Sequence, residues 1–117
     1  MTQEDLRTLA AAYFAAFGTR DLESCLAFFS DDSSLTFHTG DYKGINAIED
    51  WHKDRFKADL RVIDMGAMEV QESTVSLEVV VSSKRLRAWR VNELTGNVSL
   101  CFDGGKIVQA TFGLGSK

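Results

Sequence analysis

The side chains best suited to chemistry in this sequence gather in residues 42–56, YKGINAIEDWHKDRF, and at a few positions outside that segment. A histidine can act as a general base near neutral pH, and an arginine can hold a carboxylate, an enolate or a phosphate through its planar guanidinium group. Inside the segment these roles would fall to His52 and Arg55, with Trp51 beside them. The other polar candidates are Tyr13, His38, Asp41 and Asp64.

The spacing of apolar residues predicts a helix over residues 45–59. On a helical wheel, one broad face of this helix carries Ile45, Ile48, Trp51, His52, Arg55, Phe56 and Asp59. Arg55 lies near the centre of that face, so its guanidinium group must either reach solvent along its apolar stem or find an acceptor inside. The alternative is a plain ion pair between Arg55 and Asp59, four residues further on.

Two more helices are predicted before this one. The first covers residues 3–17, with Thr2 and Asp5 as its cap and Gly18 ending it in a left-handed turn. The second begins after Asp21 and reaches Phe29. The stretch SDDSS then predicts a turn, and SLTFH predicts a short strand in which Phe37 and His38 face opposite sides.

From residue 60 onward the sequence has the two-residue period of strands. LRVIDMGAMEV reads as one strand with a bulge at Gly66, TVSLEVVVS and NVSLCF follow, and DGGK predicts a hairpin turn into IVQATFGL. Residues 83–94 allow either a long hairpin or an irregular crossover. Within them KRLRAWR is a charged strand edge or a small anion-binding patch. Helices grouped beside a curved antiparallel or mixed sheet define an α+β fold.

Composition excludes several classes of protein. With 117 residues and 13.0 kDa, residues 1–117 are expected to form a single domain. No apolar run approaches the ~20 residues of a membrane span, and the acidic start MTQEDLRTL does not resemble a signal peptide, so a cytoplasmic location is expected. A net charge of −4 argues against nucleic acid as a partner. Two cysteines and two histidines on separate elements suggest no metal site, and no cofactor is expected.

Three segments, in this order and spacing, resemble the SnoaL-like branch of the nuclear transport factor 2-like superfamily. They are Tyr13 followed by AAFGTRDLESCLAFFSDD, then YKGINAIEDW, then LTGNVSLCFDGGKI. This branch includes ketosteroid isomerases, polyketide cyclases and limonene epoxide hydrolases. The resemblance implies a cone, in which three helices wrap a strongly bent sheet over a pocket. It also implies a homodimer formed through the outer face of the sheet.

The catalytic carboxylates of these enzymes do not carry over to this sequence. Tyr13 matches the tyrosine of the ketosteroid isomerases, but their proton-carrying aspartate falls on Phe37 and their neutral acid falls near Val98. In the limonene epoxide hydrolase pattern Arg90 matches the arginine, while Asn92 stands in place of the aspartate. Both catalytic templates are therefore incomplete in this chain.

The hypothesis that follows is a small-molecule binding domain, or a cofactor-free enzyme, with a conical apolar pocket for an apolar or anionic ligand. Its expected lining is Tyr13, Phe17, Phe37, Trp51, His52, Arg55, Leu100 and Phe102. Tyr13, His52, Arg55 and His38 are the candidates for isomerase-like or cyclase-like acid–base chemistry, and whether the chain is an enzyme stays open. The alternatives are a non-catalytic dimerising or protein-interaction module, or a nucleic-acid binder that uses residues 84–90.

Overall fold

Helices and one mixed sheet make up the fold of the computed structural model, which describes residues 2–38, 40–90 and 93–114. The helices are α1 (Gln3–Gly18), α2 (Leu22–Leu26), α3 (Ile45–Lys57) and a short α4 (Lys84–Ala88). The strands are β1 (Phe29–Phe37), β2 (Gly40–Lys43), β3 (Arg61–Met65), β4 (Glu69–Gln71), β5 (Thr74–Ser82), β6 (Leu94–Asp103) and β7 (Lys106–Leu114).

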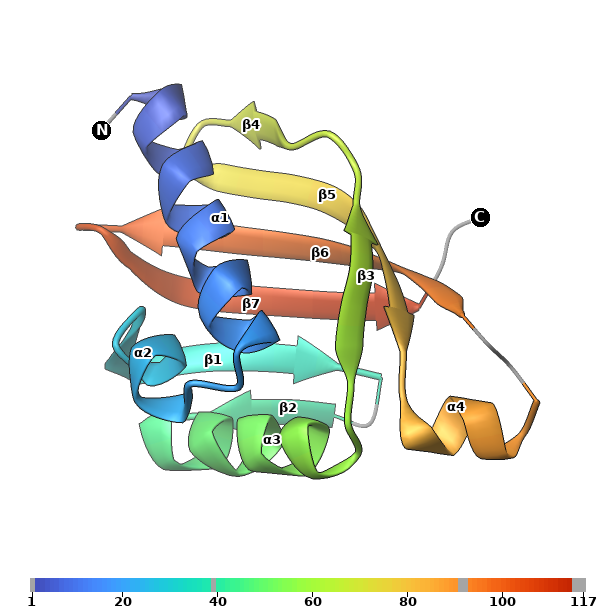
Figure 1. Cartoon of the computed structure of the whole chain (residues 1–117). Helices are drawn as coiled ribbons and strands as arrows, with labels where there is room; N and C mark the ends of the chain where they lie inside the picture. Colours follow the sequence, from blue (N-terminus) through green and yellow to red (C-terminus); the bar gives the residue numbers. More distant parts are fainter. Residues whose placement is uncertain (1, 39, 91–92, 115–117) are drawn as a thin grey trace.

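The strands lie in the order β2-β1-β7-β6-β5-β3, and β4 pairs with the first residues of β5, 74–76. Only β1 and β7 run parallel among the paired strands of the described chain. Figure 1 shows α1 crossing the face of β5, β6 and β7, with α2 and α3 beside β1 and β2. The predicted α+β fold with a curved mixed sheet is therefore confirmed.

The helix starts follow the sequence signals closely. The Asp5 backbone N–H donates to the Thr2 hydroxyl at 3.1 Å, and the Thr2 N–H donates to the Asp5 carboxylate at 3.1 Å, which is a complete capping box. Asp21 caps α2 in the predicted way. The left-handed residue after α1 is Arg20, with φ of 57°, and not Gly18.

The predicted turn at SDDSS is wrong, because these residues belong to β1. The second helix accordingly ends at Leu26, and Phe29 is a buried strand residue. Ser33 explains the difference, since its buried hydroxyl donates to the Ile107 carbonyl at 2.7 Å and accepts from the Ser30 N–H at 2.9 Å. These bonds tie a polar stretch into the sheet where β1 meets β7, with a register shift between Phe29 and Ser34.

Two predictions for the second half also need correction. Gly66 does not form a bulge inside one strand; it lies between β3 and β4, and its N–H donates to the Glu78 carbonyl at 2.8 Å. Residues 84–88 form α4, capped by the Ser83 hydroxyl, so KRLRAWR is not a strand edge and no long hairpin forms. Asn92, which stands at the position of the epoxide hydrolase carboxylate, lies outside the described residues.

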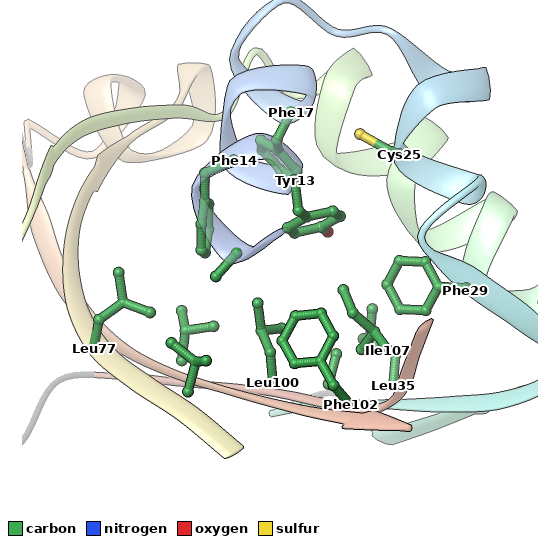
Figure 2. Close-up of a cluster of buried hydrophobic side chains, with 14 of the residues drawn as sticks. Tyr13, Phe14, Phe17, Cys25, Phe29, Leu35, Leu77, Leu100, Phe102 and Ile107 are labelled. Carbon is green, nitrogen blue, oxygen red and sulfur yellow. The ribbon is translucent and has the colours of Figure 1, made fainter. Parts of the chain in front are cut away.

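The core fills the space between α1 and the concave face of the sheet. Figure 2 shows Tyr13, Phe14 and Phe17 of α1 above Leu77, Leu100 and Phe102 of the strands. Burial of these large apolar side chains is the main force that holds the helix on the sheet. No helix of the described chain combines the length and the apolar character needed to cross a membrane.

Candidate functional site

A cavity of about 270 Å³ lies beside this core, where α3 and α4 meet the concave face of the sheet. Most of its lining is apolar, and its aromatic members are Phe14, Phe17, Phe37, Trp51 and Phe112. His38, Arg55, Ser83 and Asn97 are its polar lining residues. Such a volume is close to the lower end of the range for pockets that bind small molecules.

Two small residues form part of the cavity wall. Gly96 is a buried, inward-facing residue of β6, and a Cβ atom at this position would lie 3.0 Å from the Gly113 carbonyl oxygen. Ala58, at the end of α3, contributes only a methyl group to the wall. Gly96 and Ala58 are thus two small residues in the lining of the cavity.

Arg55 lies in the wall of the cavity with its side chain only 13% exposed. Its guanidinium carbon is 4.9 Å from the ring centroid of Phe37 and 5.6 Å from that of Trp51, which is cation–π geometry. The terminal NH2 group pairs with Asp54, so the alternative of an ion pair with Asp59 is wrong. Among the described residues, the buried Nε–H of Arg55 has no hydrogen-bond partner.

Trp51 contributes a second donor of the same kind. Its side chain is 2% exposed, and its ring packs on Phe112 with 4.9 Å between the centroids. The indole Nε1–H is also buried without a partner in the part of the chain that the structure describes. Two unsatisfied N–H groups, one helical turn apart on α3, thus lie beside an apolar cavity. Buried donors are rarely left unpaired unless a ligand, an ion or water completes them.

Tyr13 and His52 are hydrogen-bonded to each other in the core and do not line the cavity. The His52 Nδ1 atom lies 2.8 Å from the Ile48 carbonyl oxygen, which can only accept, so Nδ1 carries the proton. The neutral Nε2 atom then accepts from the Tyr13 hydroxyl at 2.7 Å. Both side chains have no exposed surface.

Burial sets the protonation states of this pair. It lowers the pKa of His52 to about 4, against a smaller opposite effect of the hydrogen bond to Ile48. Burial, with a smaller contribution from Cys25, raises the pKa of Tyr13 well above its ordinary value. The pair is therefore neutral at pH 7 and, in this geometry, offers neither a free base nor a free donor to a ligand.

His38 is placed differently from the sequence expectation. Strand alternation predicted that it faces away from Phe37, but β1 ends at Phe37, and the His38 ring lies in the following turn with 4.1 Å between the two ring centroids. Both residues line the cavity, and His38 is exposed at its edge. Asp41 and Asp64 are exposed and do not line it.

Four of the eight side chains predicted for the pocket line the cavity: Phe17, Phe37, Trp51 and Arg55. Tyr13, His52, Leu100 and Phe102 instead fill the core next to it. Phe112 is a lining residue that the sequence analysis missed. The alternation of IVQATFGL, which puts Ala110 and Phe112 on the same face, is the signal that could have found it.

The described residues contain no group of three or more His, Cys, Asp or Glu side chains that could hold a metal ion. The chemistry of the cavity is instead that of hydrogen-bond donation. Arg55 and Trp51 can each donate to an oxygen atom inside it, while aromatic rings cover an apolar body.

The profile of the SnoaL-like domain matches residues 10–110, so the chain belongs to this family. A candidate polyketide cyclase from Sinorhizobium meliloti has a similar structure, with 18% identity and a TM-score of 0.80 over 96% of this chain and 99% of that one. A candidate ketosteroid isomerase from Kribbella flavida is also similar in structure, with 16% identity and a TM-score of 0.81. The match covers 97% of this chain and 80% of that one.

A third similar structure is an NTF2-like protein of unknown function from Cytophaga hutchinsonii. It shares 13% identity, with a TM-score of 0.76 over 94% of this chain and 89% of that one. At these identities the likeness concerns the fold alone. No curated protein matches the chain in sequence.

Proposed function

We propose that this chain is a small-molecule binding domain whose ligand occupies the cavity between α3, α4 and the sheet. The observation that carries the proposal is the cavity of about 270 Å³, apolar over most of its wall and provided with two buried N–H groups that lack partners among the described residues. Its size and lining suit a rigid apolar molecule of two or three fused rings.

Filling the cavity tests this proposal. Ala58→Leu adds three carbon atoms to the wall and should strongly weaken the binding of 2-ethylnaphthalene, a flat apolar probe, as measured by titration calorimetry. Binding to the unaltered chain should show a negative heat-capacity change, the mark of buried apolar surface. Ala15→Leu, the same substitution on the exposed face of α1, is the control and should leave the affinity unchanged.

Failure of the unaltered chain to bind any flat apolar probe would contradict the proposal. It would favour the alternative of a non-catalytic dimerising or protein-interaction module, in which the side chains around the cavity serve only to hold the fold.

Arg55 gives the proposal a second test, with an anionic probe. Arg55→Ala should weaken 2-naphthoate by about 1.5 to 3 kcal/mol, the range for a hydrogen bond to a charged group. The same substitution should barely alter 2-ethylnaphthalene, because that probe has no oxygen for the guanidinium group to meet. Equal losses for both probes would mean that Arg55 acts only through packing.

A further inference from the structure

Two neighbouring side chains in the wall of the cavity carry buried hydrogen-bond donors. They are the Nε1–H of Trp51 and the Nε–H of Arg55, both without a partner among the described residues. The two residues lie one turn apart on α3, and the guanidinium carbon of Arg55 is 5.6 Å from the Trp51 ring centroid.

These donors are held in position before any ligand arrives. Phe37 and Trp51 both lie within cation–π distance of the Arg55 guanidinium group, and its terminal NH2 is paired with Asp54. The Trp51 ring is itself packed between Phe112 and Phe37, with centroid distances of 4.9 and 5.6 Å. Because neither side chain has to be ordered on binding, little of the hydrogen-bond energy is lost to side-chain entropy.

The other polar lining residues are already hydrogen-bonded, face the outer side of the sheet or are exposed to water. The Ser83 hydroxyl oxygen accepts from the Leu86 N–H as the cap of α4. Asn97 is exposed and alternates with the buried residues Gly96 and Val98, which directs its side chain to the outer side of the sheet. His38 is exposed to water at the edge.

We infer that the site selects ligands whose oxygen carries no hydrogen, such as a ketone or carboxylate oxygen, over the corresponding alcohol. A carbonyl or carboxylate oxygen only accepts, and its lone pairs can satisfy either of the two donors. An alcohol oxygen also accepts, but its own O–H would be buried next to a cationic guanidinium group without an acceptor. Leaving one polar group unsatisfied in this way weakens binding by roughly 5- to 150-fold. This inference rests on the proposed binding function and names its ligand class.

Three matched probes test the inference: 2-acetylnaphthalene, 1-(2-naphthyl)ethanol and 2-ethylnaphthalene, which differ only at the oxygen. The ketone should bind the unaltered chain at least roughly 5-fold more tightly than either of the other two. In Trp51→Phe and in Arg55→Met the ratio of the ketone affinity to the 2-ethylnaphthalene affinity should fall towards unity, a ratio in which packing changes that affect both probes alike cancel. Trp89→Phe is the control, since Trp89 is 82% exposed and does not line the cavity.

The possible outcomes distinguish a failure of the carbonyl preference from a failure of the proposed binding function. Equal affinities for the three probes would overturn the carbonyl preference. If Ala58→Leu then abolished the binding of all three, the cavity would still be the binding site. A preference that survives in both Trp51→Phe and Arg55→Met would overturn the inference as well, because other groups would then hold the oxygen. Binding of none of the probes would overturn both proposals.

Discussion

Burial divides the two histidines of this chain into different chemical roles. His52 has no exposed surface and is hydrogen-bonded through both ring nitrogens, whereas His38 is exposed at the edge of the cavity. The position of His52, one helical turn from Arg55 and next to Trp51, indicates that its side chain faces inward. Both of its ring nitrogens are nevertheless taken up by hydrogen bonds, to Tyr13 and to Ile48. At the scale of single residues, the function of a polar group depends on which partners it has already satisfied.

The stability of the fold should therefore depend on the protonation of His52. Its pKa is about 6.5 in an unfolded chain and about 4 in the folded one. Above pH 6.5 the stabilisation from the neutral ring is fully present. As pH falls from about 6.5 to about 4, the unfolded chain binds the proton first, and the free energy of unfolding should drop by roughly 3 kcal/mol from this group.

Urea unfolding at a series of pH values measures this effect as the difference between the unaltered chain and His52→Gln. His38→Gln is the matched control and should keep the acid sensitivity of the unaltered chain. Parallel pH profiles for the unaltered chain and His52→Gln would contradict the assignment of a neutral, buried imidazole.

At the scale of elements, one carboxylate joins the helices to the edge of the sheet. Asp59, in the left-handed conformation with φ of 57°, pairs with Arg20 after α1. It also accepts from Arg61 of β3 at 3.2 Å and from Arg87 of α4 at 3.0 Å. Its neighbours Ala58 and Leu60 both line the cavity. The cluster therefore positions the wall formed by the end of α3 and by α4.

The pKa of Asp59 reflects this position. Partial desolvation is the largest single influence and raises the pKa, but hydrogen bonds from Arg87 and Arg61 and the charges of Arg61 and Arg20 together hold it below its ordinary value. Above that pKa the carboxylate is ionised and can hold the three arginines.

Asp59→Asn should therefore loosen α4 without unfolding the sheet. The amide protons of residues 86–89 should exchange faster with solvent, because the neutral amide binds the Arg87 and Arg20 guanidinium groups less strongly. Hydrogen exchange followed by NMR measures this directly, with the centres of β5 and β6 as the internal reference. Asp50→Asn, on the exposed side of α3, is the control. Unchanged exchange rates for the α4 amides in Asp59→Asn would contradict the prediction. They would show that the Ser83 cap and the packing of Leu86 are enough to hold α4 in place.

At the scale of the whole molecule, the two faces of the sheet differ in what they meet. The concave face is covered by α1 (Figure 1) and borders the cavity, whereas most outward-facing residues of β5, β6 and β7 have small side chains. These outward residues include Ser76, Val80, Thr95, Ser99 and Thr111, and the hydroxyl oxygens of Ser76 and Ser99 lie 3.3 Å apart. The face is thus largely polar, with Val80 and the exposed Glu78 among small side chains.

We predict that this face forms a homodimer, since the small side chains over most of it allow two copies to approach closely about a two-fold axis. Ser99→Arg would bring like charges together across that axis and should shift the chain to monomers, as measured by light scattering at several concentrations. Ala12→Arg, on the exposed side of α1, adds the same charge away from the sheet and should leave the dimer intact. A monomer mass for the unaltered chain at every concentration would refute the prediction.

Periodicity in the sequence was enough to predict the main helices, the strand-rich second half and the inward position of Arg55. These features depend on local spacing and on caps such as the pair of Thr2 and Asp5, which neighbouring residues determine by themselves. The family resemblance added the wrapping of a bent sheet by the helices and the expectation of a pocket.

Only the tertiary structure decided which inward side chains fill the core and which surround a cavity. Tyr13 and His52 are 39 residues apart, and their mutual hydrogen bond removes both from the site. Ser33 becomes a strand residue because its hydroxyl meets the carbonyl of Ile107, 74 residues away. A cavity is the volume that remains after distant elements have packed, so it depends on long-range contacts that no local pattern contains.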